Sequence, residues 1–158
     1  NGTIADNIRF GKPDATEEEI IQAAKTAQAY DFIMEKEHGF EEEITEGATN
    51  VSGGQKQRLS IARALVRKPD IYVFDDSFSA LDFKTDATLR KDLKKVTANS
   101  IVMVVAQRIS SIMDADRIVV LNEGNVIGMG THRELLKSCE IYKEIALSQL
   151  SEEELAHE

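Results

Sequence analysis

Residues 50–58 have the sequence Asn-Val-Ser-Gly-Gly-Gln-Lys-Gln-Arg, and residues 71–76 have the sequence Ile-Tyr-Val-Phe-Asp-Asp. The first stretch predicts a helix that Ser52 caps and that ends near Arg67, before Pro69. The second stretch predicts an apolar strand that ends in two carboxylates. A helix N-terminus attracts phosphate, and a carboxylate at a strand end can act on Mg²⁺. Together the two stretches predict half of a nucleotide-hydrolysing site.

The order and spacing of these stretches resemble the nucleotide-binding domain of an ATP-binding cassette (ABC) transporter. In that family Ser-Gly-Gly-Gln is the signature motif and the apolar strand is Walker B. The resemblance covers almost the whole chain: residues 79–82, Ser-Ala-Leu-Asp, are similar to the D-loop, and Gln107 falls at the position of the switch histidine. The family implies an α/β fold, a P-loop NTPase-like cassette with a helical subdomain.

The phosphate-binding P-loop of such a cassette has the pattern G-x-x-x-x-G-K-[ST], and residues 1–158 contain no such string. The chain begins in a segment that resembles the one just after the Q-loop. We therefore expect the C-terminal part of a cassette without its Walker A part. A missing Walker A strand is expected to expose sheet edge and apolar surface, and so to favour self-association or partial disorder.

We divide the chain into three segments. Residues 1–50 are expected to form the helical subdomain and the loop before it. Residues 51–137 carry the signature helix, Walker B, the D-loop and the switch region, and residues 138–158 form a C-terminal helix and an acidic tail. Local signals add further expectations, which are a Thr16–Glu19 capping box, an Asp31 cap on a short helix, strands over 101–105, 117–121 and 126–129, and a Thr131–Glu134 capping box.

The residues at the Walker B end depart from the family pattern. Asp75 is expected to act on Mg²⁺, and Asp76 stands where the family carries a glutamate as catalytic base. Aspartate is one methylene shorter, which moves the carboxylate by about 1.5 Å, and an error on the order of 1 Å can cost about a hundredfold in rate. Gln107 can hydrogen-bond a phosphate but cannot carry a proton between groups. We therefore predict a degenerate site that retains nucleotide and turns over slowly.

The signature is nearly intact, with Val51 in place of the usual leucine. In this family the signature of one domain closes over ATP that Walker A of the opposite domain holds. The resemblance thus implies that Ser52, Gly53, Gly54 and Gln55 contact nucleotide in trans, and that Asp82 of the D-loop belongs to the nucleotide-binding residues. It implies ATP and Mg²⁺ as cofactors and a second cassette as partner, in a heterodimeric multidrug or lipid-type exporter. Transmembrane domains would dock through coupling helices.

Composition limits the other classes of function. The net charge of −9 argues against sequence-independent nucleic-acid binding, which needs a basic face. The longest apolar run, residues 101–106, is far shorter than the roughly 20 residues that cross a bilayer. We expect a location at the cytoplasmic face of the cell membrane through other domains, with this fragment alone soluble and inactive as an ATPase. The lone Cys139 is expected to be a buried thiol, and His38 and His132 to be surface or capping residues.

Two alternatives stay open. One is a soluble ABC ATPase of DNA repair or translation. Repair proteins usually interrupt the helical region with long coiled coils, whereas residues 13–50 contain no sustained heptads. Translation factors usually keep the glutamate that Asp76 replaces. The other alternative is a non-catalytic fragment that docks on an intact transporter domain, which the missing Walker A part keeps in consideration.

Overall fold

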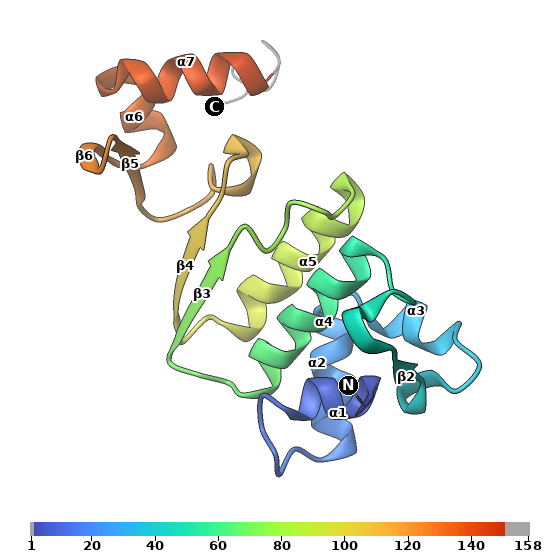
Figure 1. Ribbon diagram of the computed structural model, residues 1–158. Coiled ribbons are helices and arrows are strands. Elements are labelled where there is room, and N and C mark those ends of the chain that lie inside the picture. The colour runs from blue at the N-terminus through green and yellow to red at the C-terminus, as the bar shows by residue number, and fades with distance from the viewer. Residues whose placement is uncertain (1, 151–158) are drawn as a thin grey trace. The chain divides into compact units, whose positions relative to one another are not determined.

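The computed structural model describes residues 2–150 of the 158-residue chain. The chain divides into two compact units, residues 1–103 and 104–158, and each is described by itself (Figure 1). The tail predicted over 151–158 lies outside the described residues.

The first unit is mainly helical. Its helices are α1 (Ile4–Arg9), α2 (Glu17–Thr26), α3 (Tyr30–Met34), α4 (Gly53–Val66) and α5 (Phe83–Val96), with 3₁₀ turns at Gly39–Glu41 and Glu46–Ala48. Its strands are β1 (Gly2–Thr3), β2 (Glu43–Ile44), β3 (Ile71–Asp75) and β4 (Ile101–Val105), the last of which continues into the second unit.

Helix α4 is the centre of the helical packing, because both α1 and α2 contact it. Its inward positions are apolar and buried, namely Leu59, Ile61, Ala62, Leu65 and Val66. The chain leaving α1 passes so close that a Cβ added at Gly11 would lie 2.0 Å from the carbonyl oxygen of Arg63, so only glycine fits there. The predicted start at Ser52 is confirmed, and the helix ends at Val66, close to the predicted end.

Of the caps predicted at Thr16 and Asp31 in the first unit, the structure contains the first and not the second. The hydroxyl of Thr16 accepts from the Glu19 N–H at 3.2 Å, and the Glu19 carboxylate accepts from the Thr16 N–H at 3.2 Å, which confirms the predicted capping box. The expected Asp31 cap is wrong. Ala29 precedes α3 in a helical conformation, without a side-chain cap, and Asp31 lies inside the first turn.

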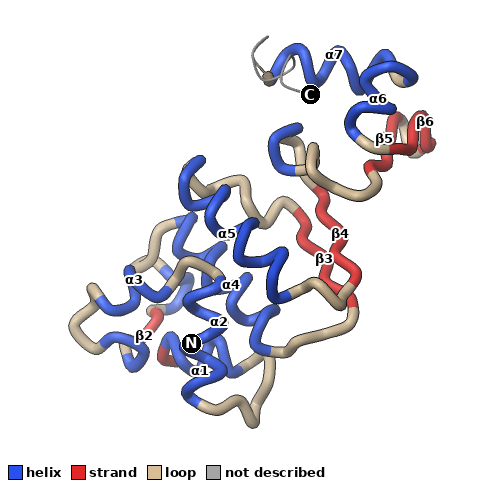
Figure 2. The backbone as a smooth tube through the Cα atoms, turned by 180° about the vertical axis from the view of Figure 1, so that it is seen from behind, coloured by secondary structure: helices blue, strands red, loops and turns tan. Residues whose placement is uncertain are grey.

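Strands β3 and β4 are neighbours in a two-stranded sheet. They run in the same direction with α5 as the connection, and the helices lie on one side of them (Figures 1 and 2). Tyr72 and Phe74 point to the buried side and their rings stack at 5.9 Å. On the other side Ile71 and Val73 are 55% and 63% exposed. The described strands thus carry an exposed apolar face, as expected, while self-association stays a prediction.

The second unit is a hairpin packed against two helices. It contains a 3₁₀ turn at Ile109–Ser111, the antiparallel strands β5 (Ile118–Asn122) and β6 (Asn125–Gly130), and the helices α6 (His132–Ser138) and α7 (Glu140–Gln149). The predicted hairpin and the Thr131–Glu134 capping box are confirmed. Its buried cluster consists of Ile109, Ile118, Val120, Leu135, Cys139, Tyr142, Ala146 and Leu150.

The expectation for His132 is wrong, since its side chain is buried rather than on the surface. Its Nδ1 lies 2.6 Å from the Tyr142 hydroxyl, and the two rings meet edge to face. Cys139 is buried, as predicted. Within residues 2–150, none of the helices combines the length and the apolar character that a membrane span requires.

Candidate functional site

The first turn of α4 is closed by two side chains that cap each other's backbone. The Ser52 hydroxyl accepts from the Gln55 N–H at 3.2 Å, and the Gln55 side-chain carbonyl accepts from the Ser52 N–H at 2.9 Å. A helix leaves its first four N–H groups without helical partners. Since this pair satisfies two of them, the amides of Gly53 and Gly54 are the two that the helix and its cap leave for another acceptor.

The charge at this helix end also differs from that of the other capped helices. At the position of Gln55, the capping boxes of α1, α2 and α6 carry the carboxylates of Asp6, Glu19 and Glu134. The first turn of α4 contains no acidic residue. The partial positive charge of the helix N-terminus is therefore not offset, which favours an anion there. Our sequence interpretation missed this neutral cap, although Ser-x-x-Gln is the capping-box pattern.

The two carboxylates lie where β3 ends. Asp75 is the last residue of the strand, and Asp76 follows with φ of 46°, a left-handed conformation that aspartate tolerates better than most residues. The Ser77 hydroxyl donates to the Asp75 carbonyl at 3.2 Å, and the Ser79 hydroxyl donates to the Asp76 carbonyl at 3.0 Å. Backbone and hydroxyl groups thus hold the turn, while both carboxylates stay exposed.

The carboxylates at the end of β3 suit a Mg²⁺ ion that is bound together with a phosphate. Mg²⁺ in such sites takes one or two carboxylates and completes its shell with phosphate oxygens and water. Asp75 offers one carboxylate, and residues 2–150 contain no cluster of three or more metal-binding side chains. The residues therefore suit a shared metal and not a protein cage.

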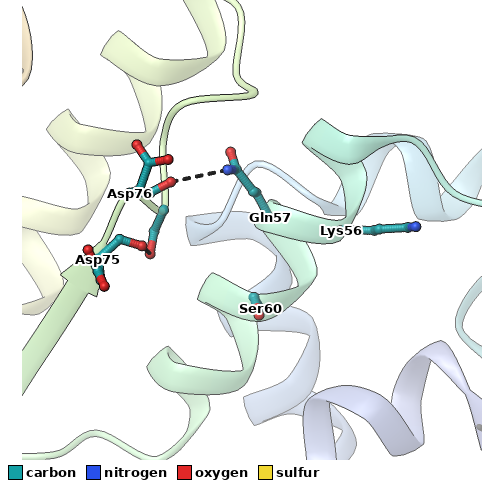
Figure 3. Close-up of a pocket in the computed structure, with 6 residues that line it drawn as sticks. Lys56, Gln57, Ser60, Asp75 and Asp76 are labelled. Atoms are coloured by element: carbon teal, nitrogen blue, oxygen red, sulfur yellow. Dashed lines mark hydrogen bonds between the residues drawn. The ribbon is translucent and has the colours of Figure 1, made fainter. Parts of the chain in front are cut away.

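A surface cavity of about 270 Å³ lies between α4 and the end of β3. Its lining joins the two predicted motifs, with Lys56, Gln57 and Ser60 from α4 and Asp75, Asp76 and Ser77 from the strand end. Figure 3 shows the Gln57 side chain pointing toward Asp76, whereas the Lys56 side chain points away from both aspartates. The structure thus brings α4 and the end of β3, which carry the predicted signature and Walker B motifs, together within the first unit.

Arg58, next in sequence, connects α4 to the α2–α3 segment. Its guanidinium donates to the Gln28 carbonyl at 2.7 Å and lies over the Phe32 ring, 4.7 Å from the ring centre. Burial lowers the pKa of Arg58 below its usual value, and the carboxylates of Asp82, Asp31 and Glu35 act in the opposite direction. Helix α4 is therefore tied to the helical segment before it by a partly desolvated cation.

Asp82 caps α5. One carboxylate oxygen accepts from the Thr85 N–H at 3.0 Å and the other from the Thr85 hydroxyl at 2.6 Å. The hydroxyl bond first, and then the backbone bond, lower the pKa of Asp82 below 3.8. Our sequence interpretation missed this cap, although aspartate is one of the preferred residues just before a helix. Contact of Asp82 with nucleotide stays a prediction.

Gln107 belongs to the second unit and is described there by itself. Its side chain is exposed, and its backbone carbonyl accepts from the side-chain amide of Gln149 at 2.9 Å. The same Gln149 accepts from the Ile109 N–H at 2.8 Å. The end of α7 therefore holds the segment that carries Gln107, a contact between residues 42 apart that no local sequence pattern announces.

The ABC transporter family model matches residues 1–79, half of the chain, a span that includes both predicted motifs, residues 52–55 and 71–76. This chain belongs to the ABC transporter family. The predicted α/β cassette fold with its helical subdomain is confirmed by a bacterial Atm1-family ABC exporter solved with ATP bound. That structure matches with a TM-score of 0.91 and 37% identity over 96% of this chain and 27% of its own.

Curated relatives in the ABC transporter family are similar over most of this chain. An uncharacterised ABC transporter ATP-binding protein of Mycobacterium bovis is 46% identical over 152 residues, which are 94% of this chain and 26% of that protein. A Staphylococcus aureus protein, named as a candidate multidrug export ATP-binding/permease protein, is 41% identical over 90% of this chain and 25% of its own. The chain thus spans about a quarter of the length of the curated relatives it matches.

Proposed function

We propose that this chain is part of the ATP-binding and ATP-hydrolysing domain of an ABC exporter. Family membership supports the proposal, as do the likeness to an exporter solved with ATP bound and to a relative named for multidrug export. The observation that carries it is the first turn of α4. There, two glycine amides lie at a helix end whose positive polarity no carboxylate offsets.

In this proposal the signature acts on ATP that a second cassette holds. The amides of Gly53 and Gly54 donate to the terminal phosphate. The hydroxyl of Ser52 accepts from the Gln55 N–H and keeps its own hydrogen to donate, because a hydroxyl is both donor and acceptor. Gln55 keeps the turn in shape through the reciprocal cap and adds no charge that would repel phosphate.

The residues at the end of this chain's own Walker B strand contribute the hydrolytic groups of the second ATP site. Asp75 would hold Mg²⁺, which neutralises phosphate charge when bound. Asp76 would accept a hydrogen bond from the attacking water, Gln107 would hydrogen-bond the phosphate, and Asp82 would line the nucleotide site from the D-loop. Phosphoryl transfer depends chiefly on such positioning and charge stabilisation. Because aspartate is shorter than glutamate and glutamine cannot take a proton, this site hydrolyses ATP slowly.

The resulting assembly is asymmetric. This chain gives a nearly intact signature to its partner's site and a weak base to its own, which suits a heterodimeric exporter with one active and one degenerate site. Transmembrane domains complete the transporter through coupling helices on the helical segment. The location that follows is the cytoplasmic face of the cell membrane.

The test is Gln55→Glu in the transporter that contains this chain, paired with an unaltered partner cassette. Glutamate keeps the reciprocal cap and places a negative charge beside the terminal phosphate. We expect ATP turnover to fall by about tenfold or more, the scale of losing a donor to a developing anion, with an unchanged melting temperature.

The matched control is Gln22→Glu, which adds the same charge at an exposed position on α2. Turnover in this control is expected to match that of the unaltered protein. If Gln55→Glu also left turnover unchanged, the signature end would not receive phosphate, and the proposal would be wrong.

A further inference from the structure

The side chain of Gln57 joins α4 to the segment that follows Walker B. Its amide nitrogen donates to the Asp76 carbonyl at 3.2 Å and to the Ser79 hydroxyl at 3.0 Å (Figure 3 shows the first bond). Its amide oxygen accepts from the Ala80 N–H at 2.9 Å. One side chain therefore uses both of its donor hydrogens and its acceptor on residues about twenty positions further along the chain.

These bonds hold the turn that follows β3, and the backbone conformation of that turn sets the direction of the Asp76 side chain. Aspartate adopts a positive φ more readily than most residues with a Cβ, but this conformation is still less favourable than a negative φ, so the bonds around Asp76 help to stabilise its φ of 46°. The Asp76 carbonyl accepts from both the Gln57 amide and the Ser79 hydroxyl. Because the direction of a side chain follows from its backbone torsions, the groups that hold this carbonyl also aim the Asp76 carboxylate.

The same segment lies directly against the first turn of α4. A Cβ added at Gly54 would lie 2.9 Å from the Ala80 carbonyl oxygen, whereas one added at Gly53 would lie 3.7 Å from the Ala80 Cβ. Gly54 and Gln57 are three residues apart and so share one face of the helix. That face is therefore fitted to residues 76–80 by close backbone packing and by the amide bonds together.

We propose that Gln57 is a positioning residue that fixes the Asp76–Ala80 segment to the signature helix. A displacement of the α4 N-terminus is then passed to the Asp76 carboxylate of the same chain. Arg58 ties the same turn of α4 to Gln28 and Phe32, so α4 connects the helical segment to the Walker B turn. The hydrogen bonds of Gln57 are observed in the structure, whereas their effect on ATP turnover rests on the proposed function.

The first test measures the contact in the chain of residues 1–158, by hydrogen exchange of single backbone amides. In Gln57→Ala the Ala80 N–H loses its acceptor, and its exchange should become about tenfold faster. Gln57→Glu keeps an acceptor oxygen and should keep most of the protection. The matched control Gln22→Ala, on the exposed side of α2, should leave Ala80 unchanged. Unchanged Ala80 exchange in a folded Gln57→Ala variant would overturn the proposal.

The second test measures ATP turnover of the transporter that contains this chain, for the same variants. With the partner cassette's own hydrolytic site disabled, so that only this chain's site turns over, we expect kcat to fall about tenfold in Gln57→Ala with little change in KM, because the variant misaims Asp76 without removing a nucleotide contact. ATP turnover should also be low in Gln57→Glu, because glutamate lacks the two amide hydrogens that Gln57 donates. This is expected even though the variant still protects the Ala80 amide from exchange. A purely structural role would lower the melting temperature and leave kcat unchanged, and that result would overturn the proposal.

The two tests separate the two hypotheses. If the unaltered transporter hydrolysed no ATP, the proposed function would fail while hydrogen exchange at Ala80 still decided the Gln57 contact. If the transporter were active and Gln57→Ala sped Ala80 exchange without lowering kcat, the proposed function would stand and the positioning role would fail.

Discussion

The side-chain amide of Gln149 donates to the backbone carbonyl of Gln107 at 2.9 Å, which links the end of α7 to the residue that we predict at the family's switch position. The other end of the same amide accepts from the Ile109 N–H at 2.8 Å, and Ile109 is buried. The side chain of Gln149 thus holds both the Gln107 carbonyl and the Ile109 N–H, next to the 3₁₀ turn at Ile109–Ser111. The C-terminal helix therefore has a direct part in orienting the residue that we expect to contact phosphate.

Gln149→Ala should loosen this segment. It leaves the part-buried Ile109 N–H without its acceptor, which typically costs about 1 to 3 kcal/mol, whereas the exposed Gln107 carbonyl can bond to water instead. We expect faster exchange of the Ile109 amide and a lower urea midpoint in circular dichroism. Ser148→Ala, at the exposed neighbouring position, should change neither quantity. Equal Ile109 exchange in the two variants would show that the Gln149 contact carries no stability.

Gly54→Ala and Gly53→Ala should have opposite effects on stability. The methyl group at position 54 would meet the Ala80 carbonyl at 2.9 Å, so we expect a loss of about 1 to 3 kcal/mol from overpacking. At position 53 the methyl group meets only ordinary contact at 3.7 Å, so the higher helix propensity of alanine should make the change neutral or favourable. Urea unfolding without nucleotide measures both, and equal losses would contradict the close approach of α4 and residues 76–80.

Asp76→Glu combined with Gln107→His should raise ATP turnover of the assembled transporter. The longer side chain moves the carboxylate by about 1.5 Å, and histidine restores a group that can carry a proton. At this chain's own site, measured at saturating ATP with the partner's hydrolytic site disabled, we expect an increase of about tenfold or more. Single variants serve as controls for each contribution. If the double variant had the turnover of the unaltered protein, the degenerate-site interpretation would have to be abandoned.

The Asp82 cap should make the stability of α5 depend on pH in acid. The pKa of Asp82 is lowered in the folded state, so its contribution is present above the unfolded value of 3.8 and is lost as pH falls below it. Asp82→Asn keeps a cap that does not titrate. The melting temperature of the unaltered protein should therefore fall toward that of Asp82→Asn below about pH 4. A constant difference between the two proteins down to pH 2 would contradict the effect.

A further variant tests the Asp82 cap itself at neutral pH. Asp82→Ala removes the bonds to the Thr85 N–H and hydroxyl, and should lower the melting temperature by about 2 to 4 °C. Lys91→Ala, at an exposed position on the same helix, provides the control for α5. A drop of similar size in the control would mean that the loss at Asp82 is not specific to the cap.

Local sequence patterns predicted much of the secondary structure because the contacts concerned span three or four residues. The caps at Ser52, Thr16 and Thr131 and the 118–130 hairpin are of this kind. Asp31 shows the limit of such reasoning. A capping side chain needs an extended backbone at its own position, and here the chain is already helical at Ala29, so no cap forms.

The sequence by itself determined the family, and it predicted the motifs and the departures at Asp76 and Gln107, because these depend only on residue type and spacing. Only the tertiary structure decided what holds those residues. Gln57 reaches residues 19 to 23 positions away, Gln149 reaches back across 42, and His132 is buried against Tyr142. Such contacts form only when packing brings distant segments together, so no periodicity or local motif encodes them.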